Sequence, residues 1–221
     1  MNPTIFFSVC SLFYSILLIV ISKRLSVENK ENKIFKYLVF ANLIGLIFEV
    51  SGLLLAGNYD NYRIINNLIL RGMLIYHMVW ISLFVLYVLA ISNGKRFLEA
   101  KKTKTISIII VAVVSMINIF LPFTCAVKNG VVVYTYGTAV DFVFLYSFLC
   151  DIFCFIVMFK NIKNVPKYKY SPLFVLLSVG TVVSMIQSAY PHYLLATSMH
   201  TFVSYVIYVT IETKLLKEAK K

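Results

Sequence analysis

Seven long apolar segments, separated by polar loops, dominate the pattern of hydrophobic and polar positions along the chain. A helix of about 20 apolar residues is long enough to cross the hydrocarbon core of a bilayer. The sequence therefore predicts an all-α, polytopic membrane protein with seven transmembrane helices. The expected spans are residues 4–22, 34–57, 64–92, 106–126, 139–160, 171–190 and 192–212.

Lysine and arginine alternate from rich to poor in successive loops. The first, third and fifth loops and the C-terminal tail together hold 18 of the 21 basic residues. Short cytoplasmic loops retain Lys and Arg, whereas translocated loops lose them. We therefore expect the N-terminus outside and the C-terminus in the cytoplasm. This topology accounts for the net charge of +12, so the expected partner is the lipid bilayer and not nucleic acid.

The composition leaves little room for a soluble domain, since 60% of residues are hydrophobic and 14% are charged. The first apolar run has no basic segment before it and no cleavage site after it, so we expect it to remain as an anchor. The sequence contains no nucleotide-binding loop and none of the recognised catalytic or metal-binding spacings. We therefore expect no enzymatic activity, no metal and no cofactor.

Polar residues inside the spans are the most informative positions, because each is costly in lipid and usually faces the bundle interior. Most lie in the half predicted to be external, which indicates a cavity that opens outward to a ligand. The alternative is that they form hydrogen bonds between helices and only hold the bundle together. The candidate pocket residues are Glu49, Asn67, Arg71, His77, Asn118, Asp141, Asp151, Gln187 and His200.

Two charged residues within the second and third spans lie at matching depth. Glu49 and Arg71 are each roughly 10 to 12 Å from the outer surface, at about 1.5 Å per helical residue. Because consecutive helices are usually neighbours, an ion pair between them is one hypothesis. The alternative is that the third helix begins later and that Arg71 reaches the outer interface.

The external loop of residues 127–138 contains a turn signal, Asn129-Gly130, before a β-prone stretch. This order predicts a short hairpin or a lid over the pocket. The tyrosines of that stretch, Tyr134 and Tyr136, are also typical of the aromatic belt at a membrane interface. We favour the belt interpretation slightly.

The last span continues without Pro or Gly into a charged segment of strong helix formers, residues 212–221. Residues 208–212, Tyr-Val-Thr-Ile-Glu, resemble the exit of the multi-spanning sensor regions found ahead of bacterial histidine kinase or diguanylate cyclase domains. Residues 136–143, Tyr-Gly-Thr-Ala-Val-Asp-Phe-Val, are similar to the start of that family's fifth span. Thr213 and Thr138 depart from the family pattern, which has Asn-Pro and Pro at these places.

This resemblance implies a sensory input domain over residues 1–212 and the start of a cytoplasmic signalling helix over residues 213–221. A small-molecule or peptide signal would be detected in the outer half, and Ile211, Glu212 and Leu215 would transmit it to a kinase or other output module. The resemblance also implies a homodimer in a bacterial cell membrane. The chain would then be a sensor half that is truncated, excised or paired with a separate output protein.

Two other function classes use the same residues. A small transporter, or a substrate-binding membrane subunit, would bind its cargo at the polar positions, but it would also need an inward-facing polar half-site, and transporters often have interrupted helices near the midplane. An intramembrane enzyme would require His77 or Asp151 to be activated by partners that the sequence does not identify.

Overall fold

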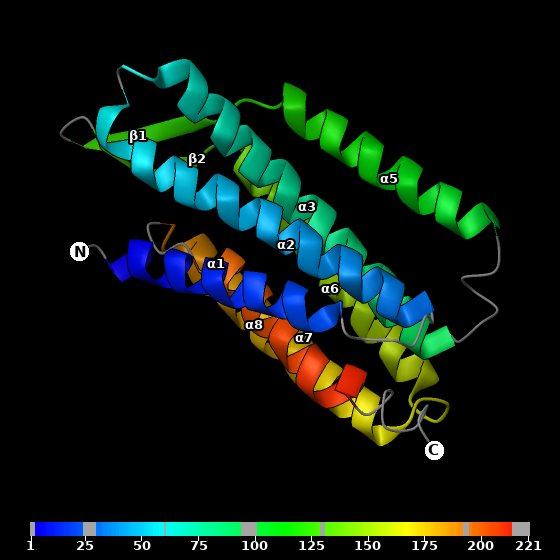
Figure 1. The fold of residues 1–221 in the computed structure, drawn as a ribbon. Coiled ribbons are helices and arrows are strands. Elements are labelled where there is room, and N and C mark those ends of the chain that lie inside the picture. The colour runs from blue at the N-terminus through cyan, green and yellow to red at the C-terminus, as the bar shows by residue number, and fades with distance from the viewer. Residues whose placement is uncertain are drawn as a thin grey trace.

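The computed structural model describes residues 3–23, 30–59, 61–93, 101–128, 131–191 and 195–213, and the described chain is almost entirely helical (Figure 1). In chain order the elements are α1 (Pro3–Ser22), α2 (Lys30–Leu55), η1 (Ala56–Asn58), α3 (Arg63–Asn93), α5 (Lys101–Phe120), β1 (Thr124–Lys128), β2 (Val131–Tyr136), α6 (Thr138–Asn161), α7 (Lys167–Ala189), α8 (Ala196–Ile207) and η2 (Tyr208–Glu212).

Five of the described helices, α1, α2, α3, α6 and α7, are long and apolar enough to cross a membrane. The two other predicted spans are helical but shorter. The apolar part of α5 covers Thr105–Phe120, and α8 ends at Ile207, where the five-residue π-helical turn η2 takes over. The fourth predicted span is also too long at its C-terminus, because Ala126 lies in strand β1.

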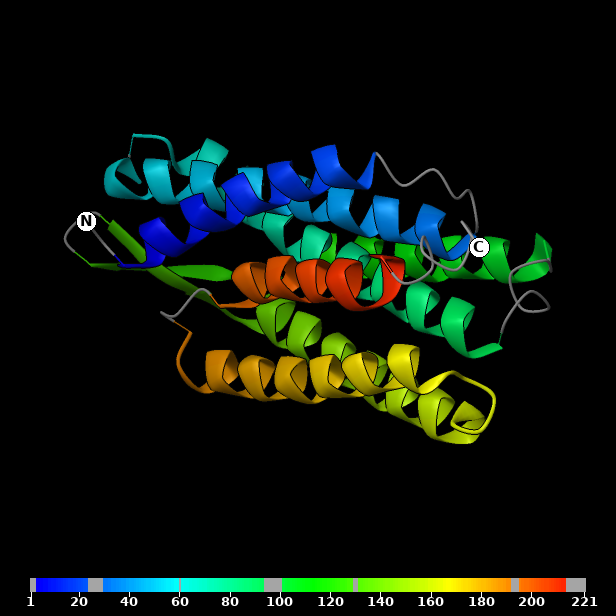
Figure 2. The same ribbon diagram turned by 60° about the horizontal axis from the view of Figure 1, so that its bottom comes forward.

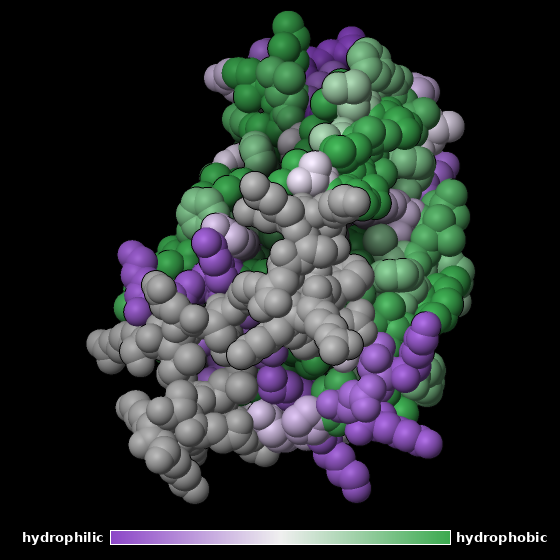
Figure 3. Space-filling view, turned by 90° about the vertical axis from the view of Figure 1, so that its right-hand side faces the viewer, coloured by the Kyte–Doolittle hydropathy of each residue, from purple (hydrophilic) through white to green (hydrophobic). Residues whose placement is uncertain are grey.

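Helix α3 lies at the centre of the bundle. It packs against α2 on one side and α6 on another, while α5 lies against its outer face. Helix α8 contacts α1, α2 and α7. Figure 1 shows α5 at one edge of the bundle, and Figure 2 shows α1 on the upper side. Large apolar side chains on α1 and α5 are exposed, with Phe13 at 69% and Phe120 at 81%. Such faces suit contact with lipid, and hydrophobic residues cover the upper and right-hand flanks in Figure 3.

Strands β1 and β2 form an antiparallel hairpin at one end of the bundle, beside η1; we call this the hairpin end. The hairpin predicted from the sequence is therefore confirmed, with an irregularity in its register between Ala126 and Val127. Its turn, Asn129-Gly130, lies outside the described residues. Gly137 joins β2 to α6 with φ of 113°, a left-handed conformation that favours glycine. A Cβ atom there would also lie 3.3 Å from Pro122 O.

Candidate functional site

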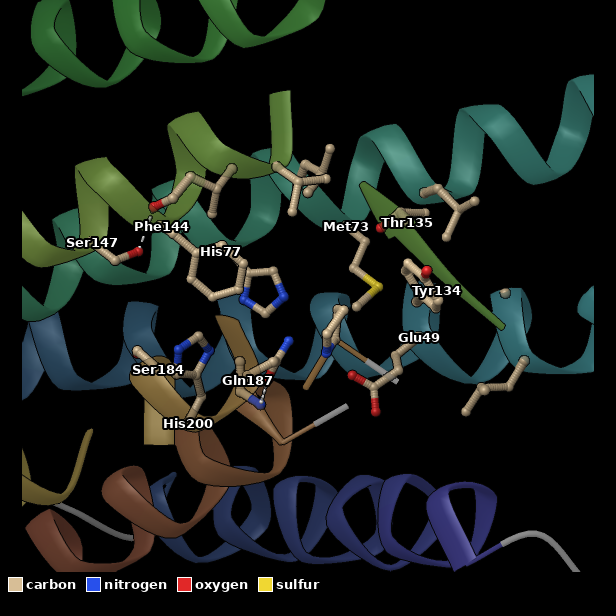
Figure 4. A pocket seen from close by; sticks show the side chains of 18 of the residues that line it. Glu49, Met73, His77, Tyr134, Thr135, Phe144, Ser147, Ser184, Gln187 and His200 are labelled. Atoms are coloured by element: carbon tan, nitrogen blue, oxygen red, sulfur yellow. Dashed lines mark hydrogen bonds between the residues drawn. The ribbon is translucent and has the colours of Figure 1, made fainter. Parts of the chain in front are cut away.

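A cavity of about 130 Å³ lies at the hairpin end, between α2, α3, α6, α7 and α8 and beside strand β2. Its wall is largely apolar, with Leu53, Leu70, Met73 and Phe144 among the lining side chains. Polar groups enter from every surrounding element (Figure 4). They belong to Glu49, Asn66, His77, Tyr134, Thr135, Ser147, Ser184, Gln187 and His200.

Glu49 is the acidic group of this cavity. The residue is only 2% exposed, and its Oε1 atom accepts a hydrogen bond from the Ser8 hydroxyl of α1. The Thr197 hydroxyl of α8 lies beside the same carboxyl. However, neither Glu49 Oε2 nor Thr197 Oγ1 has a hydrogen-bond partner among the described residues. Buried carboxylate oxygens are normally satisfied, so Glu49 has unused capacity to bind a donor.

A hydrogen-bond network lies directly beneath the cavity and joins four helices. Asn42 Nδ2 donates to Thr201 Oγ1 at 2.8 Å and to Ser15 Oγ at 3.4 Å. The Tyr76 hydroxyl donates to Asn42 Oδ1 at 3.0 Å and lies 2.8 Å from His200 Nδ1. Residues of α1, α2, α3 and α8 are thus held together at a single level of the bundle.

The Tyr76 ring occupies this position because α2 carries a glycine opposite it. A Cβ atom at Gly45 would lie 2.1 Å from the ring of Tyr76, far inside contact distance. Only glycine allows the aromatic ring and the α2 backbone to approach this closely. Gly45 is therefore a structural requirement of the network.

His200 connects the cavity to the network. Its ring stacks on Trp80, with centroids 3.7 Å apart and planes at 8°, and its centroid is 5.3 Å from that of His77. Because the Tyr76 hydroxyl has one hydrogen and donates it to Asn42 Oδ1, His200 Nδ1 must carry a proton to complete its own bond with Tyr76. His200 Nε2 is consequently an acceptor when the ring is neutral.

A second, smaller cavity of about 50 Å³ lies farther from the hairpin end. It shares Ile81, Ser147, Ser184, Ala196 and His200 with the first cavity. Asp151 lines this second cavity and accepts a hydrogen bond of 3.0 Å from Thr181 Oγ1.

The structure brings four of the nine predicted pocket residues to the first cavity, namely Glu49, His77, Gln187 and His200. Gln187 helps to shape it, because its Oε1 atom accepts the backbone N–H groups of Leu195 and Ala196 at the start of α8. Asp141 lies outside the cavity, exposed in the first turn of α6.

The hypothesis of an ion pair between Glu49 and Arg71 is wrong, because the two side chains have separate partners. The alternative, a third helix that begins later, is wrong too, because α3 begins at Arg63. Arg71 Nη1 donates to the carbonyl oxygens of Asn118, at 2.6 Å, and Leu121, at 2.9 Å. Its guanidinium also lies 4.4 Å from the centre of the Phe123 ring. The carbonyl groups at the C-terminal end of α5 can accept further hydrogen bonds and carry a partial negative charge, which both favour a cation.

Asn67 and Asn118 also have structural partners instead of lining the cavity. Asn118 Nδ2 donates to Ala139 O at 2.8 Å and so ties α5 to α6. Asn67 Oδ1 accepts from the Tyr59 hydroxyl at 3.2 Å and from the Cys125 thiol at 3.8 Å. Burial raises the pKa of Cys125, which keeps the thiol protonated and able to donate.

The hairpin forms part of the cavity wall. Val133, Tyr134 and Thr135 of β2 all line it, and Figure 4 shows Tyr134 and Thr135 at one side of the cavity. Tyr134 therefore contributes to the cavity wall, while Tyr136 is 49% exposed. The lid alternative describes β2 better.

Sequence reasoning missed several residues of the site, including Ser8, Tyr76, Trp80, Ser147 and Ser184. Serines and aromatics occur throughout the spans, so their type alone carries no signal. The close spacing of Tyr76 and His77 with Trp80 on one helix, opposite Gly45, was the available indication. Asn66 also lines the cavity, but it was not among the candidate pocket residues.

Far from the hairpin end, the last helix is enclosed by its neighbours. Ile211 and Glu212 are both fully buried, and the Tyr87 hydroxyl of α3 donates to Glu212 Oε1 at 2.9 Å. Lys169 Nζ of α7 forms an ion pair with Glu31 Oε2 of α2 at 2.7 Å. Leu215, the third predicted transmission residue, lies outside the described residues.

No model of a known protein family matches the sequence, and no curated protein is detectably similar to it.

Proposed function

We propose that this membrane-embedded chain is a sensory input domain. It detects an external or membrane-dissolved small ligand in the cavity at the hairpin end. The last helix then passes the signal to a cytoplasmic output module of histidine kinase type, outside this sequence. In this proposal the hairpin end faces outward and Glu212 lies at the cytoplasmic side, as the distribution of basic residues predicts.

One observation carries the proposal: a single helical run contacts the cavity and also forms the exit from the bundle. His200 of α8 lines the cavity, and the helix continues through η2 to Glu212. At that point Ile211 is fully buried and Glu212 is bonded to Tyr87. A displacement of α8 at the cavity would therefore reach the exit through packed side chains, because protein interiors are close-packed.

The π-helical turn η2 gives the exit a second useful property. π-helical turns are rare and occur frequently at functional sites. The change from α to π hydrogen bonding alters the rotational register of the residues that follow. Ligand binding would favour one arrangement of α8 and η2 over another, which is the population shift expected of a two-state sensor.

The transmission step is tested by interrupting the helix after Glu212. The chain is joined through its native C-terminus to a histidine kinase output module, and autophosphorylation is measured with and without inducing ligand. Insertion of Gly-Pro after Glu212 is expected to abolish the ligand response, because proline and glycine break helices. Insertion of Ala-Ala at the same place is the control for added length. An unchanged response in the Gly-Pro variant would refute transmission through this helix.

A further inference from the structure

We propose that the ligand of the cavity is a small organic ammonium ion with an apolar body, whose cationic nitrogen binds Glu49. This inference rests on the proposed function, and it specifies the chemistry of the signal. Its three supports are the charge of the cavity, the polarity of the groups that face it, and its size.

The first support is an acidic group without a counter-charge. Glu49 is 2% exposed and its Oε2 atom has no partner among the described residues. None of the described residues that line the cavity is Lys or Arg, and Arg71 is already bonded to the end of α5. A buried charge is stable only when it is paired. A cation inside the cavity would supply the missing partner.

The second support is that two residues in the cavity wall each carry an unused hydrogen-bond acceptor. Glu49 Oε2 is one, and His200 Nε2 is the other, because the bond between His200 and Tyr76 fixes the hydrogen on Nδ1. Figure 4 shows both side chains at the cavity wall. An ammonium group provides up to three N–H donors and no acceptor, so it complements this arrangement. A carboxylate ligand would place a second acidic group beside Glu49.

The third support is size and apolar lining. A cavity of roughly 150 Å³ accommodates benzene in a protein interior, and the volume here is about 130 Å³. The ligand body is therefore limited to about the size of a benzene ring, which excludes a folded peptide or a lipid. Leu53, Leu70, Met73 and Phe144 supply the apolar surface for such a body.

The test uses three probes with one branched body and different charges: isoamylamine, isoamyl alcohol and isovalerate. The intact chain is placed in nanodiscs of zwitterionic lipid, and binding is followed by the fluorescence of Trp80, the single tryptophan of the sequence. Trp80 reports on the cavity because it stacks on His200. We expect the amine to bind about tenfold or more tightly than the alcohol, as for a buried charge pair, and isovalerate not to bind.

Variants at Glu49 test the residue itself. Glu49→Gln is expected to remove the preference for the amine, and Glu49→Asp to retain part of it. Asp141→Asn is the matched control, because it removes an exposed carboxyl near the same end of the bundle and should leave all three affinities unchanged.

Several results would overturn the inference. The first is that the unmodified chain binds the alcohol as tightly as the amine or more tightly. The second is that the amine does not bind. The third is that Asp141→Asn loses the preference for the amine to the same extent as Glu49→Gln. The unmodified chain alone decides the first two, so the inference can be refuted even if Glu49→Gln fails to fold. Because this assay contains no output module, amine binding without any effect on kinase output would refute the sensory function while leaving the ammonium site intact.

Discussion

The two ends of the bundle differ in how they enclose an acidic residue. At the hairpin end, Glu49 borders an open volume, and its second carboxylate oxygen has no partner among the described residues. At the other end, Glu212 is fully buried and bonded to Tyr87, next to the fully buried Ile207 and Ile211. Its Oε2 atom also has no partner among the described residues, but Glu212 borders neither cavity. The first arrangement leaves space for a ligand. The second has the close packing that transmits a displacement. A sensor needs both properties in one helix, and α8 with η2 connects them.

The largest expected effect on stability follows from a substitution at the end opposite the hairpin, where Glu212 is buried; we call this the packed end. Phe35 is fully buried, and its ring lies 6.2 Å from that of Tyr87 and 6.4 Å from that of Tyr208. Phe35→Ala should lower the free energy of unfolding by about 3 to 5 kcal/mol, because it removes a large buried side chain. Unfolding in a denaturing detergent titration measures this. Phe13→Ala, at a residue that is 69% exposed, should cost far less, and equal losses would refute the packing difference.

A somewhat smaller effect is expected at the boundary between the two regions. Gly45→Ala places a methyl group 2.1 Å from the Tyr76 ring, so the ring must move and the Asn42 network must break. Overpacking of this kind costs about 1 to 3 kcal/mol. The control is Gly180→Ala on α7, where a Cβ atom meets nothing within 4 Å. The comparison is contradicted if both substitutions leave stability unchanged in the same titration.

Removal of the Tyr87 hydroxyl tests the contact between α3 and η2 at Glu212. Tyr87→Phe leaves the buried Glu212 carboxyl without its donor, which should cost about 1 to 2 kcal/mol. It should also change basal autophosphorylation when the chain is joined to a kinase module, because the contact positions η2. Tyr205→Phe, at a residue that is 45% exposed, serves as the control. A Tyr87→Phe variant with normal stability and normal basal activity would show that this contact does not position the exit.

The smallest effect on stability is expected at the hairpin end. Ser8→Ala removes the hydroxyl that donates to Glu49 and should cost about 0.6 kcal/mol, the average for a hydrogen bond between transmembrane helices. Ser178→Ala removes only a bond within α7, to Phe174 O, and is the control. If Ser8→Ala lowered the free energy of unfolding by several kcal/mol, the hairpin end would be as tightly packed as the packed end, and the comparison would be contradicted.

The helices were predictable because each apolar run is long and its ends carry charge or turn residues. The hairpin was predictable from Asn129-Gly130 and the β-prone residues after it. Their polarity within the spans placed Glu49, His77, Gln187 and His200 among the candidate pocket residues, and they do line one cavity. These features depend on local sequence or on position along the membrane normal.

The failures arose where rotation about the helix axis and neighbouring backbone decide the contact. Glu49 and Arg71 lie at matching depth, but Arg71 binds the carbonyl groups at the end of α5. Every helix end offers such carbonyls, so their role has no sequence signal. The partner of Glu49 is Ser8, an ordinary residue in an apolar span. The π-helical turn η2 contains neither Pro nor Gly, which left no local sign of the change in hydrogen bonding.

The central claim is that events in the cavity reach the exit through the last helix. It is tested most directly by filling the cavity with Ser184→Phe in the chain joined to a histidine kinase module and measuring autophosphorylation. Ser184 lines both cavities, and Met185→Phe is the control because the adjacent Met185 is 64% exposed. The account predicts that Ser184→Phe changes kinase activity, that Met185→Phe does not, and that Gly-Pro after Glu212 abolishes the change. Equal kinase activity in Ser184→Phe and the unmodified chain, with both folded, would contradict it.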